Sequence, residues 1–143
     1  MGECFAEAIG GKGEYAELTG AVSDTNAVFR SDAYHEVIDP YAAMTMAAQE
    51  SVSGDQQEAF EKTKIILQNH PNLKGIICGK DAMALGAVTA IQAAGLEGKV
   101  IVVSYGGSDA ARDQVIAGNM ICTCLEPLYL LWPAITYSSS FFL

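Results

Sequence analysis

Basic side chains are scarce in this chain of 143 residues: eight lysines and arginines stand against 17 aspartates and glutamates, giving a net charge of −9. A nucleic-acid partner requires a basic face that displaces counterions, so this balance argues against one. Long apolar runs are missing too. The best candidate, residues 128–135, contains Pro133 and falls far short of the roughly 20 residues that span a bilayer. The sequence therefore predicts no nucleic-acid binding and no membrane span.

The motifs of common enzyme classes are also missing. There is no G-x-S-x-G elbow and no G-x-x-x-x-G-K-[ST] loop. Neither His35 nor His70 has an Asp, Ser or Cys partner at the spacing of a catalytic motif. Both histidines are expected at the surface. The stretch Tyr105–Ser108 (YGGS) follows a β-rich run and opens a helical one, which leaves a phosphate-binding domain as a weak alternative. We expect no catalytic site, no metal and no cofactor.

Four cysteines, at positions 4, 78, 122 and 124, raise the question of a metal site. Cys122 and Cys124 share one face of an expected strand, but no second pair or nearby histidine completes a zinc site. We expect all four to be small buried apolar residues. The N-terminus has neither the basic region nor the apolar core of a signal peptide, so either the chain is cytosolic or its gene product begins upstream.

Short β-rich runs alternate with helical patterns along the chain. The runs cover residues 14–19, 43–48, 75–79, 100–104 and 120–125, and the helical patterns begin near residues 25, 53, 81 and 108. In the second and third of these helices, Ser53 (with Gln56 reaching back) and Asp81 are the expected N-caps. Right-handed β-α-β crossovers then predict an α/β fold, a three-layer doubly wound parallel sheet. We expect this domain to cover residues 1–127, followed by an irregular tail over 128–143 that is foreign to the fold.

Polar residues that follow the strands are the candidate ligand contacts, because open α/β sheets bind ligands outside the carboxyl ends of their strands. This rule selects the strand-end segments 23–25, 49–55, 80–81 and 105–108, together with Arg30 and Glu126. The leading individual candidates are Arg30, Lys80, Asp81 and Glu126. Each of them also has a purely structural interpretation. The alternatives are an ion pair of Arg30 with Asp32 or Glu36, a solvated Lys80, an N-capping Asp81 and an ordinary strand-end charge at Glu126.

Several of these segments resemble the periplasmic sugar-binding proteins of the ribose-binding type. They are residues 13–34 (beginning GEYAELTG), 66–75 (ILQNHPNLKG), 80–87 (KDAMALGA) and 100–107 (VIVVSYGG), of which the third is the most specific. The resemblance covers residues 2–127 and implies one lobe, the C-terminal one, of a type I periplasmic binding protein. Such proteins close two lobes around a sugar in the periplasm and deliver it to the permease of an ABC transporter.

The resemblance also implies five ligand positions. Arg30 matches the arginine that grips sugar hydroxyls, whereas Gly54 stands where an aromatic residue often stacks on the ring. Lys80 replaces an asparagine, Gly106 an acceptor aspartate and Glu126 a glutamine. Only Arg30 is unaltered. Two interpretations follow: an atypical ligand, anionic to match Arg30 and Lys80, or a truncated gene copy that has lost its function.

The function implied is the sugar-binding component of a carbohydrate ABC transporter, with a monosaccharide and a permease as partners. The alternative is the effector-binding domain of a lac-repressor type transcription regulator, which shares the fold. Such regulators usually place a proline-acid pair before the strand that follows the 80–87 motif. Residues 95–100 (GLEGKV) contain no proline, which favours the transporter.

Overall fold

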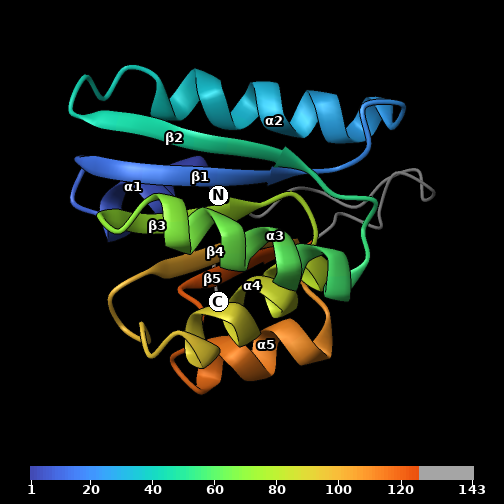
Figure 1. Cartoon of the computed structure of the whole chain (residues 1–143). Coiled ribbons are helices and arrows are strands. Elements are labelled where there is room, and N and C mark those ends of the chain that lie inside the picture. Colours follow the sequence, from blue (N-terminus) through green and yellow to red (C-terminus); the bar gives the residue numbers. More distant parts are fainter. Residues whose placement is uncertain (126–143) are drawn as a thin grey trace.

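A computed structural model describes residues 1–125 and shows a parallel sheet of five strands in the order β2-β1-β3-β4-β5 (Figure 1). This is the α/β doubly wound arrangement that the sequence predicts. The strand order reverses between β1 and β3, since the chain crosses from the edge strand β2 over β1 to form β3. The strands are β1 Gly13–Thr19, β2 Met44–Ser51, β3 Leu73–Cys78, β4 Ile101–Gly106 and β5 Cys122–Leu125.

Helices cover both faces of the sheet and complete three layers (Figure 1). Helices α1 (Gly2–Ala8) and α2 (Thr25–Ile38) pack against each other on one face. Helices α3 (Gln56–Asn69), α4 (Asp81–Ala93) and α5 (Asp109–Ile116) form a row on the other, with α4 between its neighbours. Because α2 precedes the reversal in strand order and α4 follows it, the two helices leave the sheet toward opposite faces.

The central strand β3 is apolar on both sides because two cores meet at it. Ile76 and Ile77 are both fully buried, and adjacent side chains of a strand point to opposite faces. Ile76 joins the core beneath α3 and α4, whereas Ile77 joins the smaller core that contains Phe5 and Tyr34. A continuous apolar run is therefore the correct signature of this strand.

Two local expectations need correction. Strand β2 ends at Ser51 and not at residue 48, because its ladder with β1 continues to the pair Thr19 and Ser51. The N-cap of α3 is Asp55 and not Ser53: the Asp55 carboxylate accepts from the Glu58 amide at 2.8 Å. The Glu58 carboxylate, in the first turn of α3, accepts from the amide and hydroxyl of Ser53. Ser53 is therefore a donor to a helix side chain and not the N-cap.

The expectation that every cysteine is a small buried apolar residue is wrong for two of them. Cys4 of α1 and Cys122 of β5 form a disulfide, which ties the first helix to the last described strand. Cys78 is free and buried, as expected, and Cys124 is free and half-buried. The sequence spacing gave no sign of this pairing, because 118 residues separate the two partners.

Within residues 1–125, none of the helices has both the length and the apolar character needed to cross a membrane. The same residues contain no group of three histidine, cysteine or acidic side chains placed to hold a metal ion. The predicted domain boundary at residue 127 and the predicted irregular tail over 128–143 lie outside the described residues.

Candidate ligand site

The carboxyl edge of the sheet brings together side chains from three strand-to-helix junctions. Asp24 lies between β1 and α2, Lys80 lies between β3 and α4, and Tyr105 lies near the end of β4. Arg30, on the second turn of α2, reaches the same place. β1 and β3 flank the reversal in strand order, which is where an open sheet of this kind forms its binding crevice.

Asp24 organises the charges of this edge. Its Oδ1 caps α2 by accepting from the amides of Asn26 and Ala27, at 3.0 and 3.4 Å. Its Oδ2 lies 3.3 Å from Nζ of Lys80 and 3.9 Å from a terminal guanidinium nitrogen of Arg30. The hydrogen bond from Lys80 is the main reason why the pKa of Asp24 falls below its usual value. One carboxylate thus holds two cations from different helices.

The Arg30 guanidinium is held in place, but not all of its hydrogen-bond donors are used. Its guanidinium carbon lies 5.2 Å from the centre of the Tyr105 ring, and only 17% of its side chain is exposed. Among the described residues its buried Nε has no hydrogen-bond partner. The alternative of an ion pair with Asp32 or Glu36 is wrong, since the acid beside Arg30 is Asp24. A planar fork of donors with an unused buried N–H suits an incoming hydroxyl or carboxylate oxygen.

One turn further along α2, Tyr34 also has a buried polar atom without a hydrogen-bond partner among the described residues. Its side chain is buried, and its hydroxyl has no hydrogen-bond partner among residues 1–125. Burial raises the pKa of Tyr34, while the nearby Arg30 charge acts in the opposite direction. The phenol is therefore neutral at physiological pH. Buried polar groups without a partner are uncommon, so two of them on one face of α2 are notable.

Asp81 has a different role from the N-cap that was expected. The N-cap of α4 is Lys80, which makes no side-chain capping bond. Asp81 is buried and instead accepts from the Ser104 hydroxyl at 2.5 Å, the Thr123 hydroxyl at 2.7 Å and the Ser108 amide at 2.6 Å. Burial alone would raise the pKa of Asp81, but these hydrogen bonds outweigh it and lower the pKa. Asp81 joins α4 to β4, to β5 and to the start of α5.

Gly106 is surrounded in a way that leaves no room for the aspartate of the resemblance. A Cβ atom built on Gly106 would lie 2.7 Å from Oδ2 of Asp81, and the backbone φ of +148° favours glycine. Gly54, with a φ of +98°, has open space around it in the turn between β2 and α3. Both positions can offer a ligand only backbone groups. Glu126, the remaining predicted contact, lies outside the described residues.

The C-terminal part of α2 is fixed to the sheet by hydrogen bonds of His35. His35 bonds the almost fully buried Glu17 of β1 through Nε2, at 3.1 Å, and Asp39 through Nδ1, at 2.9 Å. Gln49 of β2 also donates to Glu17, at 2.7 Å. His35 is thus partly buried and bonded, not a free surface residue. These contacts hold the helix that carries Asp24 and Arg30.

The sequence singles out Arg30 and Lys80, whereas their neighbours Asp24 and Tyr105 stand in it only as members of the strand-end segments 23–25 and 105–108. Asp24 carried only the signal of a helix N-cap, an aspartate directly before a helical run. Tyr105 carried no signal of its own apart from its place at the end of a strand. The structure brings Arg30 and Lys80 together through Asp24, and it places Asp81 and Gly106 against each other beside β4.

Comparisons with known proteins show which family the sequence matches. The family described as the periplasmic binding protein domain matches residues 1–132. The D-apiose import binding protein of Actinobacillus succinogenes is 49% identical over 128 residues, which is 89% of this chain and 41% of that protein. The D-allose-binding periplasmic protein of Escherichia coli is 32% identical over 114 residues, 80% of this chain and 37% of that protein.

A solved structure leads to the same family. The periplasmic solute-binding protein of an ABC transporter from Actinobacillus succinogenes, determined with bound D-allose, superposes with a TM-score of 0.84 and 37% sequence identity. The match covers 85% of this chain and 43% of that one. The chain spans about two fifths of the length of these relatives. By its sequence and its fold, the chain belongs to the periplasmic binding protein domain family.

Proposed function

We propose that this chain is a sugar-binding lobe of the solute-binding component of a carbohydrate ABC transporter. The observation that carries the proposal is the state of Arg30. Its guanidinium is fixed by Tyr105 and Asp24, and its buried Nε lacks a partner among residues 1–125. A donor fork that is oriented in advance and unsatisfied on one side is suited to an oxygen-rich ligand.

The ligand we propose is a monosaccharide. Two relatives, 49% and 43% identical, are named for the import of D-apiose, and a third is named for D-allose. Asp24, with one oxygen facing Lys80 and Arg30, also offers an acceptor for a sugar hydroxyl. Because the relatives reported above are import or periplasmic binding proteins, we favour the transporter over the regulator effector domain.

The proposed setting is the periplasm, with the transporter's permease as the protein partner. The disulfide between Cys4 and Cys122 supports an oxidising compartment, where such bonds form and persist. The names of the E. coli relative and of the matched family point to the same compartment. A permease that accepts the sugar follows from the transporter role of the relatives.

The chain contains two arginines, and this allows a sharp test. In an NMR titration of the ¹⁵N-labelled chain with D-apiose and with D-allose, the side-chain Nε–H signal of Arg30 should shift and saturate. The signal of Arg112, which is exposed and pairs with Asp109, should stay in place. Since pockets normally bury most of a ligand and the chain matches 41% of its relative, we expect a Kd on the order of 1 mM or weaker.

Matched variants complete the design. Arg30→Lys should abolish the saturable shifts of neighbouring amides, because an ammonium cannot reproduce the guanidinium fork. Arg112→Lys should leave them unchanged. Glycerol at the same concentrations serves as the control for nonspecific polyol effects. The proposal fails if the Arg30 signal does not respond to either sugar, or if glycerol shifts it equally.

A further inference from the structure

Three side-chain polar atoms of residues 1–125 are buried without a hydrogen-bond partner: Nε of Arg30, the hydroxyl of Tyr34 and the hydroxyl of Thr63. Thr63 belongs to α3, on the opposite face of the sheet from α2 (Figure 1). Arg30 and Tyr34 lie one turn apart on α2 and therefore share one face of that helix. Because a buried polar atom without a partner costs free energy, two of them at one place need an explanation.

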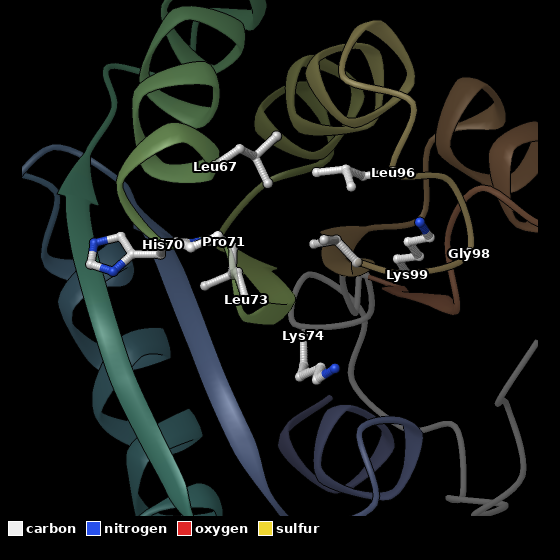
Figure 2. Close-up of a pocket in the computed structure, with 9 residues that line it drawn as sticks. Leu67, His70, Pro71, Leu73, Lys74, Leu96, Gly98 and Lys99 are labelled. Carbon is white, nitrogen blue, oxygen red and sulfur yellow. The ribbon is translucent and has the colours of Figure 1, made fainter.

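The pocket at the other edge of the sheet shows nothing comparable. It has a volume of about 340 Å³ and lies at the amino ends of β3 and β4, where its lining includes Leu67, Leu73 and Leu96 (Figure 2). None of its lining residues has a side-chain polar atom that is both buried and without a partner. Among the described residues, unsatisfied polar groups thus gather on α2 beside the candidate ligand site and not around this pocket.

The phenol of Tyr34 lies behind the partly exposed side chains of the candidate ligand site. Helical side chains point toward the N-terminus of their helix, so this phenol extends from α2 toward Arg30 and the carboxyl edge of the sheet. Burial raises the pKa of Tyr34, the Arg30 charge lowers it, and the effects of Cys124, Glu17 and Tyr105 raise it further. Charged groups shift a pKa mainly at close range, which places these side chains around the phenol.

The same groups are connected to one another by the fold. Cys124 of β5 pairs in register with Tyr105 of β4, and the Tyr105 ring lies 5.2 Å from the guanidinium carbon of Arg30. Cys124 and Tyr105 are half-buried, whereas only 7% of Tyr34 is exposed. Side-chain rotations at binding surfaces are common on association, so a ligand oxygen can reach the Tyr34 hydroxyl between these neighbours.

A phenylalanine at position 34 would fill the same space without the cost of the hydroxyl. The side chain of Tyr34 belongs to the core that also contains Phe5 and Ile77, and in that core only an aromatic ring is needed. Its hydroxyl makes no hydrogen bond within residues 1–125. A group that weakens the free chain but contacts a bound molecule accounts for this choice of residue.

We propose that Tyr34 is a specificity-determining residue whose hydroxyl forms a hydrogen bond with one hydroxyl of the bound sugar, beside the Nε–H of Arg30. This inference rests on the proposed function. A phenol both donates and accepts, whereas a guanidinium only donates, so the two residues recognise different features of the ligand. A sugar without the contacted hydroxyl leaves the Tyr34 hydroxyl unpaired and binds more weakly.

Tyr34→Phe is the test variant, and Thr63→Val is its matched control. Each removes a buried hydroxyl without a partner and nearly keeps the shape of the side chain. In thermal unfolding of the ligand-free chain, neither variant should lower the melting temperature, and each should raise it by about 3 °C. In the NMR titration with D-allose, the Kd should rise about tenfold for Tyr34→Phe and stay unchanged for Thr63→Val. A purely structural hydroxyl would not separate stability from binding in this way.

Analogues of D-allose that each lack one hydroxyl identify the contact. For one of them, the unaltered chain and Tyr34→Phe should bind equally, because neither can form the hydrogen bond. The inference is overturned if Tyr34→Phe binds D-allose as tightly as the unaltered chain, if Tyr34→Phe lowers the melting temperature, or if its penalty is the same for every analogue. If the Arg30 signal of the unaltered chain responds to D-allose but Tyr34→Phe has no effect, only this inference fails. If the unaltered chain does not respond, the proposed function fails with it.

Discussion

Nε2 of His35 lies 3.1 Å from Oε2 of Glu17, although the two residues are 18 positions apart in the sequence. The other ring nitrogen lies 2.9 Å from Oδ1 of Asp39. A neutral imidazole has a single N–H and can donate to only one of these carboxylates. Both contacts are satisfied together only by the imidazolium form, which carries two N–H groups. The fold therefore favours a charged His35 between β1 and the end of α2.

Stability should fall with rising pH because of His35. Burial lowers the pKa of His35, but the bonds to Asp39 and Glu17 outweigh it, and the pKa in the folded state is raised. The stabilising contribution is then fully present below the unfolded-state pKa of about 6.5 and is lost as the pH rises through the folded-state pKa. Urea unfolding of the chain and of His35→Gln, from acidic to mildly alkaline pH, should give a stability difference that shrinks with pH. His70→Gln is the matched control, and a constant difference for His35→Gln would contradict the assignment.

Loss of the Asp81 carboxylate should be costly. Asp81→Ala leaves the Ser104 hydroxyl and the Ser108 amide without their acceptor, and removing one member of a buried polar network costs about 3 kcal/mol. Asp109→Ala changes a carboxylate that is almost fully exposed and should cost less than about 0.5 kcal/mol. Urea unfolding measures both. Equal losses for the two variants would show that the network around Asp81 is not what holds this region.

Introducing an aspartate at position 106, the residue that the resemblance implies there, should destabilise the chain. The new Cβ would lie against Oδ2 of Asp81, and the positive φ adds strain of about 1 to 3 kcal/mol. Gly54→Asp has a positive φ as well but open space, so it isolates the effect of the contact. We expect Gly106→Asp to lower the melting temperature more than Gly54→Asp does. Equal losses for Gly106→Asp and Gly54→Asp would show that the contact with Asp81 adds nothing to the backbone strain.

Reduction should weaken the fold through the bond between Cys4 and Cys122. Disulfides typically contribute about 2 to 4 kcal/mol, and a bond that spans 118 residues belongs at the upper end of that range because it closes a long loop. Urea unfolding with and without dithiothreitol should show this difference for the chain and for Cys124→Ala, but not for Cys4→Ala. Peptide mapping by mass spectrometry under non-reducing conditions should recover the linked pair. Recovery of a bond between other cysteines would refute the pairing.

The order of strands and helices could be predicted from the sequence, whereas the pairing between strands could not. Apolar runs such as residues 75–79 and 100–104 mark buried parallel strands, because both of their faces are covered. The end of β2 was missed, since its last residues are strand only through pairing with β1. Strand pairing depends on the tertiary fold, so the residues around Ser51 do not reveal that Ser51 pairs with Thr19.

In the candidate site, too, the individual residues could be predicted but not the long-range contacts between them. Arg30 could be found because it stands in a segment that resembles a known family, and Lys80 because it follows a strand. Their link through Asp24 could not be found, as 56 residues separate Asp24 from Lys80. Asp81 looked like a local helix cap, yet its three donors come from 23 to 42 residues away. Long-range acceptors of this kind leave no periodic trace in a sequence.

The reversal of strand order between β1 and β3 has a consequence for how such lobes diversify. Asp24 and Lys80 meet at this edge because they follow the two strands that flank the reversal, so the strand order sets their places. A substitution at Lys80, whose side chain is partly exposed, would change the chemical groups at this edge while the strand order stays the same. Specificity can thus drift from one solute to another without any change in the architecture that presents it.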